Sequence, residues 1–199
     1  MSEVTIQNLS DLIEVHGKEK IQQLLSTFVS RNEDVGSFLT NKRKAINFDK
    51  ENIARTYLLL ETDEVITKIR GYISISFKSI YIDESTEVSN RKKGRLGVSP
   101  DENSFIALLI AQYGKNEDEQ HECDPKQLLG YAIDLSIEIQ KKIGGLTTVL
   151  LECDKDNDKL NTYYENIGFQ QLQISEDLSQ YYIFINKGNE PIRAYSQLN

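Results

Sequence analysis

The sequence predicts an α/β domain whose mixed, partly antiparallel central sheet is flanked by helices. Three observations lead to this prediction. Two strand-like segments, at residues 54–60 and 71–82, follow each other closely in the first half of the chain. A continuous apolar run at 105–111 precedes a long amphipathic helical pattern and a second apolar run at 146–153. Alternating apolar residues then indicate two closing strands near residues 170–185.

The first half of the chain predicts a short strand, two helices and a strand pair, at residues 4–6, 18–29, 33–45, 54–60 and 71–82. Asn32 and Asp34 are both suitable N-caps for the second helix. Only a short polar stretch at 61–64 separates the last two strands. We therefore expect them to pair as antiparallel neighbours.

A long polar segment at residues 83–103 predicts a loop, because it contains two glycines and Pro100. It also carries a dense cationic cluster, Arg91-Lys92-Lys93-Gly94-Arg95. One interpretation is a solvated loop, and the other is a surface that holds an acidic partner or coenzyme phosphates.

The second half predicts an α/β unit followed by two strands, with elements at residues 105–111, 127–143, 146–153, 158–166, 170–173 and 180–185. The strand–helix–strand unit should be a right-handed parallel crossover, with its first strand buried on both faces. An acidic, insertion-like loop fills residues 112–126. The helix buries one stripe, made of Leu128, Ala132, Leu135, Ile139 and Ile143. Gly144-Gly145 ends it. The domain spans 1–187, and 188–199 form a polar tail.

The composition is that of an ordinary globular domain. The 199 residues are 39% hydrophobic and 27% charged, which fits one domain with its own core. No apolar run approaches the ~20 residues that cross a bilayer, and the N-terminus lacks a secretory pattern. Two cysteines, Cys123 and Cys153, favour a reduced, cytoplasmic protein. The net charge of -8 disfavours a broad grip on nucleic acid.

Residues 127–132 carry the first chemical motif, Q-x-x-G-x-A, near the start of the long helix. A glycine at the mouth of a helix lets backbone N–H groups approach a phosphate, and the helix dipole favours the anion. The alternative interpretation is structural: Asp124 and Pro125 cap an ordinary helix, and Gly130 lies inside it at a cost of ~1 kcal/mol.

Residues 157–169 carry the second motif, which reads N-x-x-L-x-x-Y-Y-E-x-x-G-F. Its tyrosine pair lies near the end of a short helix, where a phenol can give up a proton. Alternatively, the two tyrosines are core residues and Gly168 is a C-cap. In this order and at this distance, the two motifs together resemble those of the GNAT acyltransferase superfamily, which binds acetyl-coenzyme A.

The resemblance implies a site. Tyr164 would be the general acid that reprotonates the coenzyme thiolate, and Asn157 would contact the pantetheine amides. Backbone N–H groups of residues 128–132 would cradle the pyrophosphate, beside the end of the preceding strand, which would pair with the pantetheine arm. The implied coenzyme-binding residues are Ile110, Ala111, Gln127, Leu128, Leu129, Gly130, Tyr131, Ala132 and Asn157. Acetyl-CoA is then a cosubstrate, and no metal-ligand spacing is present.

The general base and the acceptor are less visible in the sequence. Glu152, Asp154 and His121 are nominal bases, and Cys153 has no histidine near it in sequence, so we expect direct transfer without a covalent intermediate. The expected acceptor is a primary amine of a small molecule or peptide. A looser resemblance of residues 32–39 and 55–59 to toxin-type GNAT proteins leaves charged tRNA as the second option.

Two other classes of function stay open. The first is a non-catalytic module that binds coenzyme or a partner, and the second is a purely structural interaction protein. A homodimer is a further option, and we expect no membrane association.

Overall fold

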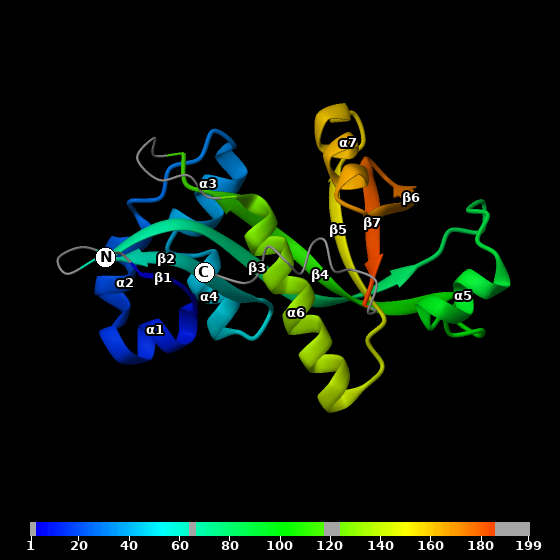
Figure 1. Cartoon of the computed structure of the whole chain (residues 1–199), viewed down its shortest axis with the longest axis horizontal. Helices are drawn as coiled ribbons and strands as arrows, with labels where there is room; N and C mark the ends of the chain where they lie inside the picture. The colour runs from blue at the N-terminus through cyan, green and yellow to red at the C-terminus, as the bar shows by residue number, and fades with distance from the viewer. Residues whose placement is uncertain (1–2, 64–66, 118–123, 186–199) are drawn as a thin grey trace. The chain divides into compact units, whose positions relative to one another are not determined.

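The computed structural model describes residues 3–63, 67–117 and 124–185 (Figure 1). The described chain divides into two compact units. The first unit contains residues 3–63, 67–76, 111–117 and 124–129, and the second contains 77–110 and 130–185.

Seven strands form the sheet in the order β1-β2-β3-β4-β5-β7-β6. Their bounds are Glu3–Asn8 (β1), Arg55–Thr62 (β2), Thr67–Tyr81 (β3), Ser104–Lys115 (β4), Thr148–Asp154 (β5), Gln170–Ser175 (β6) and Leu178–Phe184 (β7). β4 and β5 pair in parallel, whereas β1–β2, β2–β3, β5–β7 and β6–β7 are antiparallel. This is the mixed, partly antiparallel sheet that the sequence predicts, and β2 and β3 are the expected antiparallel neighbours.

The helices are Leu9–His16 (α1), Lys18–Leu25 (α2), Glu33–Thr40 (α3), Ala45–Lys50 (α4), Asn90–Leu96 (α5), Pro125–Ile143 (α6) and Asp158–Asn166 (α7). Asn32 is the N-cap of α3, because its side chain accepts from the N–H groups of Asp34 and Val35. The single helix predicted at 33–45 was wrong: α3 stops before Asn41, and α4 starts at Ala45.

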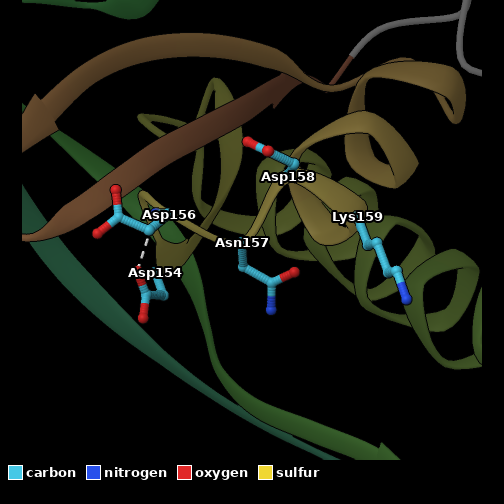
Figure 2. A pocket seen from close by; sticks show the side chains of 5 residues that line it. All are labelled: Asp154, Asp156, Asn157, Asp158 and Lys159. Atoms are coloured by element: carbon cyan, nitrogen blue, oxygen red, sulfur yellow. Dashed lines mark hydrogen bonds between the residues drawn. The ribbon is translucent and has the colours of Figure 1, made fainter.

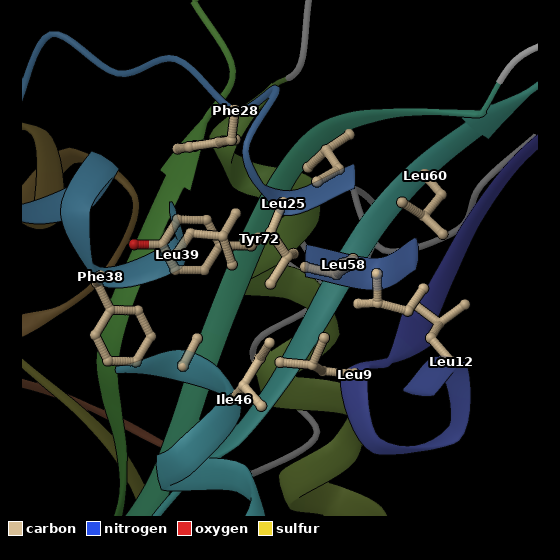
Figure 3. Close-up of a cluster of buried hydrophobic side chains, with 13 residues drawn as sticks. Leu9, Leu12, Leu25, Phe28, Phe38, Leu39, Ile46, Leu58, Leu60 and Tyr72 are labelled. Atoms are coloured by element: carbon tan, nitrogen blue, oxygen red, sulfur yellow. The ribbon is translucent and has the colours of Figure 1, made fainter. Parts of the chain in front are cut away.

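The core of the first unit lies between α1–α4 and the strands β2 and β3 (Figure 3). Leu9, Leu25 and Leu39 are fully buried against Leu58 and Tyr72. The Tyr72 hydroxyl donates to the backbone oxygen of Val35 at 2.7 Å, which ties β3 to α3. Burial raises the pKa of Tyr72 far above its ordinary value, so the hydroxyl stays a donor.

A buried carboxylate ties α4 to β2. Asp49 is only 3% exposed, and its Oδ1 lies 2.9 Å from Arg55 Nη1. Its Oδ2 accepts from the backbone N–H of Thr56 at 3.2 Å, and the hydroxyl of Ser10 in α1 donates to Oδ1. A buried charge is tolerated when it is paired and hydrogen-bonded in this way.

The second unit packs helices on both faces of its strands. Tyr182 of β7 belongs to the buried cluster that includes Leu96 of α5. The neighbouring residue Tyr181 contacts Tyr164 of α7, with 5.9 Å between ring centroids. Because successive strand residues point to opposite faces, α5 and α7 lie on opposite faces of β7. Residues of β5 divide in the same way, so Glu152 lies on the α5 face and Cys153 on the α7 face.

Three sequence predictions about α6 and β4 need correction. Ile143, predicted in the buried stripe of α6, is 83% exposed, and the stripe instead follows Leu128, Leu129, Ala132, Ile133 and Ser136. The apolar run in β4 is not buried on both faces, because Ile106 is 56% exposed. β4 also continues to Lys115, so the first part of the predicted insertion-like loop is strand.

Candidate functional site

The loop between β5 and α7 surrounds an open pocket of about 450 Å³. Asp154, Asp156, Asn157, Asp158 and Lys159 line it (Figure 2). The loop is held by hydrogen bonds of its own: the side-chain Oδ1 of Asp154 accepts from the N–H of Asp156, and the backbone oxygen of Asp154 accepts from that of Asn157. Asn157, the predicted pantetheine contact, is thus one of the residues that line this open pocket.

Asn157 also begins α7. Its Oδ1 accepts from the backbone N–H of Leu160 at 3.2 Å, which makes it the N-cap of the helix. The side-chain oxygen is thus engaged with the helix, and the amide nitrogen is the group that Asn157 can offer to a ligand carbonyl. Its predicted role as a pantetheine ligand stays a prediction.

Tyr164 lies on the inner face of α7 and is 4% exposed. Its ring is 5.6 Å from that of Tyr163, 6.1 Å from Phe169 and 5.9 Å from Tyr181, all between centroids. Burial raises the pKa of the neighbouring Tyr181, with smaller contributions from Glu165 and Cys153. The phenol of Tyr164 therefore sits among aromatic rings at the inner face of α7.

The start of α6 differs from the predicted phosphate cradle. The helix begins at Pro125, so Gly130 is its sixth residue and does not stand at its mouth. Asp124 takes the first donors: its Oδ1 accepts from Lys126 N at 2.9 Å, and its carbonyl accepts from Gln127 N at 3.0 Å. The N–H groups of Leu129 to Ala132 lie where α-helical bonds use them.

This arrangement matches the alternative in which Asp124 and Pro125 cap an ordinary helix. The expectation of an open Gly130 at the helix mouth was wrong. The donors nearest a bound anion would be those of the first turn, and Leu128 and Leu129 themselves are fully buried. The assignment of residues 127–132 to the coenzyme stays a prediction.

Ile110 and Ala111 lie where the parallel strand pair ends. β4 pairs with β5 at Leu108, Leu109 and Ile110. The pairing recorded between these two described strands stops there, although β4 continues to Lys115 and β5 to Asp154. Ile110 is 4% exposed and Ala111 is exposed. The predicted pairing of the pantetheine arm with these residues requires strand edges at which β4 and β5 no longer pair with each other.

The nominal general bases have different environments. Glu152 is held on both oxygens by Lys78 Nζ at 2.7 Å, and Gln180 Nε2 donates to it at 2.7 Å. Asp154 bonds within its own loop, and His121 lies outside the described residues. Cys153 Sγ donates to Asn161 Oδ1 at 3.1 Å, and burial raises the pKa of its thiol. Cys153 is thus a poor nucleophile.

The Lys78–Glu152 pair was missed at the sequence level. Lys78 and Glu152 are 74 positions apart in the sequence. The order of the strands along the chain does not reveal that side chains of β3 and β5 meet across β4. One clue was available: Lys78 lies two residues before Ile80 in β3, so the two side chains share a face, and Ile80 is buried.

The cationic cluster was predicted as loop and proved to be the helix α5. Ser89 is its N-cap, and Gly97 ends it in the left-handed region at φ 75°. Lys92 Nζ lies 4.8 Å from the centroid of the Tyr182 ring, and Arg95 Cζ lies 4.0 Å from that of Phe184. These contacts were not visible in the sequence.

The described residues contain neither a membrane-spanning helix nor a cluster of metal ligands. No helix in that part of the chain is long and apolar enough to cross a bilayer. No group of three histidine, cysteine, aspartate or glutamate side chains there is placed to hold a metal ion.

Comparison with known proteins gives a structural answer only. No protein-family model matches the sequence, and no curated protein matches it. A tyrosine-to-phenylalanine mutant of KacT superposes with a TM-score of 0.69 at 15% identity, covering 96% of this chain and 98% of that one. AtaT complexed with acetyl-methionyl-tRNAfMet gives 0.69 at 16%, covering 92% and 95%. AtaTR bound with acetyl-CoA gives 0.67 at 17%, covering 96% and 97%.

At such identities the likeness establishes the fold. The chain has the GNAT-like fold that it shares with KacT and AtaT. The fold predicted from the two motifs is confirmed.

Proposed function

We propose that this protein is an acetyl-CoA-dependent N-acetyltransferase whose acceptor is the amino group of an aminoacyl-tRNA. The observation that carries the proposal is the near-complete mutual coverage with KacT and AtaT, at TM-scores of 0.69. AtaT itself has been solved with acetyl-methionyl-tRNAfMet, and AtaTR with acetyl-CoA. This ranks charged tRNA above the small-molecule or peptide amine that the sequence placed first.

In the proposed reaction the acceptor amine attacks the thioester carbonyl directly. The new C–N bond forms as the C–S bond breaks, and the coenzyme leaves as a thiolate that must take up a proton. Tyr164 is the proposed donor of that proton, because its phenol is buried in an aromatic environment at the inner face of α7. The amine loses its own proton to a base or a water relay.

The proposed coenzyme site combines two features of the second unit. Asn157 presents its amide nitrogen in the β5–α7 pocket, and the β4–β5 ladder ends at Ile110. Acetyl-CoA, when bound, supplies the activated acetyl group. The protein would orient the pantetheine arm through the free strand edge and keep the thioester next to Tyr164.

The test is acetyl transfer by the purified protein. With Met-tRNA and acetyl-CoA, we expect release of free thiol together with acetylation of the methionyl amine. Tyr164→Phe should lower kcat by about 10²–10⁴ while the coenzyme dissociation constant barely changes. Tyr163→Phe is the matched control on the same helix and should retain most of the activity.

Three results would contradict parts of the proposal. Equal losses of kcat in Tyr164→Phe and Tyr163→Phe would show that Tyr164 is not the proton donor. Tight coenzyme binding without transfer to any amine would favour a non-catalytic module. If calorimetry detected no binding of acetyl-CoA, the proposed acetyltransferase activity would be excluded.

A small-molecule or peptide amine is the second candidate, and the acidic balance of the chain favours it. The net charge of -8 repels a polyanionic tRNA unless a local basic face offsets it. A methionine amide or short peptide tested beside Met-tRNA separates the two acceptors. Higher kcat/KM for the small amine would overturn the tRNA assignment.

A further inference from the structure

We propose that α5 is the surface that holds the phosphodiester backbone of the RNA acceptor. The proposal rests on the proposed function, because it assumes that the acceptor is a tRNA. Four of the seven residues of α5 are cationic, namely Arg91, Lys92, Lys93 and Arg95, and none is acidic. In a chain of net charge -8, this helix concentrates positive charge at one place.

Among the residues that the structure describes, no carboxylate forms an ion pair with the cations of α5. The ion pairs recorded within the described part of the chain join Arg31, Arg55, Arg70, Lys78 and Lys155 to acids, and none involves α5. Lys93 donates to the side-chain oxygen of Asn103 at 2.9 Å, which is a neutral partner. Arg91 and Arg95 are exposed. The charges of Arg91 and Arg95 therefore face solvent without an ion-pair partner among the described residues.

Two of the cations are held in place by aromatic rings. Lys92 lies over the ring of Tyr182, and Arg95 over that of Phe184, at 4.8 and 4.0 Å from the centroids. A cation–π contact orients the side chain and leaves the charge and its N–H donors available. Side chains fixed in this way lose less conformational entropy when they bind phosphate oxygens.

The position of α5 is also suited to an acceptor. α5 and α7 pack on opposite faces of β7, and α7 carries Tyr164 and the N-cap Asn157. The acceptor and the coenzyme would then approach the strands of this unit from opposite faces, so two polyanions would not compete for one surface. Glu152 and Lys78 lie on the α5 face.

The experiment measures binding of deacylated tRNA by fluorescence anisotropy across a salt series, without coenzyme. Arg91→Gln/Arg95→Gln should weaken binding about tenfold near physiological salt and lower the slope of log K against log salt by about 2. Arg91→Gln alone, which removes no aromatic contact, should lower the slope by about 1. Lys42→Gln/Arg43→Gln, an exposed basic pair of the first unit, is the matched control with the same charge change.

Several outcomes would overturn the proposal. Undetectable binding by the wild type would do so, as would unchanged binding by both α5 variants, or an equal loss in the control. Displacement of tRNA by an equimolar polyglutamate peptide would identify an acidic protein segment as the occupant. Neither acetyl-CoA nor an acyl group takes part in this binding experiment, so loss of tRNA binding is distinguishable from loss of acetyl transfer. Calorimetry with acetyl-CoA tests coenzyme binding separately.

Discussion

At the scale of single residues, Cys153 shows how position decides chemistry. The thiol is 7% exposed and donates to Asn161. Burial raises its pKa, and the charge of Asp154 raises it further. Because the thiolate is the reactive form, a raised pKa lowers the reactive fraction at any pH below it. Cys153 is thus a packed residue on the α7 face of β5 and has no covalent role in the proposed transfer.

We therefore expect Cys153 to resist alkylation. In a Cys123→Ser background, iodoacetamide near neutral pH should modify the folded protein at least about tenfold more slowly than free cysteine. The alkylation rate should rise with pH. The pH at which this rise is half complete should be higher for the folded protein than for the urea-unfolded chain. Mass spectrometry measures the extent of modification. Modification of the folded protein at the rate of the unfolded control would show that the thiol is ionised or open to solvent.

At the scale of elements, the sequence predicts the helices and strands whose ends and buried faces are indicated by residues close together in the chain. The helix expected at 158–166 has those bounds, because Asn157 caps it and Gly168, at φ 100°, follows its end. α5 was missed because Leu96 is its only buried side chain, so no apolar stripe exists to be recognised. α1 was missed because Asn8 ends β1 and caps α1 at once, with no turn residue between them.

The candidate site follows the same division. Tyr164 could be singled out because its motif lies within one helix. The contacts of Glu152, and those of α5 with Tyr182 and Phe184, depend on strand order and register. Strand order and register in turn depend on contacts between residues far apart in the chain, and local sequence patterns do not encode such contacts.

The packing of α3 against β4 offers a test at this scale. A Cβ added at Gly114 would collide with Val35 Cγ1, and it would lie 3.6 and 3.7 Å from the rings of Tyr72 and Phe28. Val35 is β-branched and cannot rotate away freely. Gly114→Ala should therefore lower the free energy of unfolding by about 1–3 kcal/mol through overpacking.

Urea unfolding measures this effect, and two variants give it a control. Gly94→Ala in α5 meets nothing within 4 Å, so it should be neutral or stabilise by up to about 1 kcal/mol. Gly114→Ala/Val35→Ala should be less destabilised than the sum of its single changes, because the shorter side chain removes the clash. Additive losses in the double variant would show that Val35 is not the contact that matters.

At the scale of the whole molecule, charge sets the conditions under which the function can be tested. The chain carries 31 acidic and 23 basic side chains, which gives the net charge of -8. Self-repulsion at low salt opposes the compact state, and added salt screens it over about 8–10 Å. Acetyl-CoA is itself an anion, so its own contribution to ionic strength must be matched in any comparison.

Under matched ionic strength, acetyl-CoA should stabilise the folded chain by mass action. At about a hundredfold excess over its dissociation constant, a ligand that binds only the folded state adds ~2.7 kcal/mol. For a chain of this size, that corresponds to a rise in Tm of about 5–11 °C, which differential scanning fluorimetry detects. Tyr164→Phe should show the same rise, because the phenol acts on the departing thiolate and not on the bound thioester. Asn157→Ala should show a smaller rise relative to its own unliganded Tm, because the proposed contact with the pantetheine is lost. A Tm that does not move at any concentration of acetyl-CoA would mean that the fold is kept without its coenzyme site.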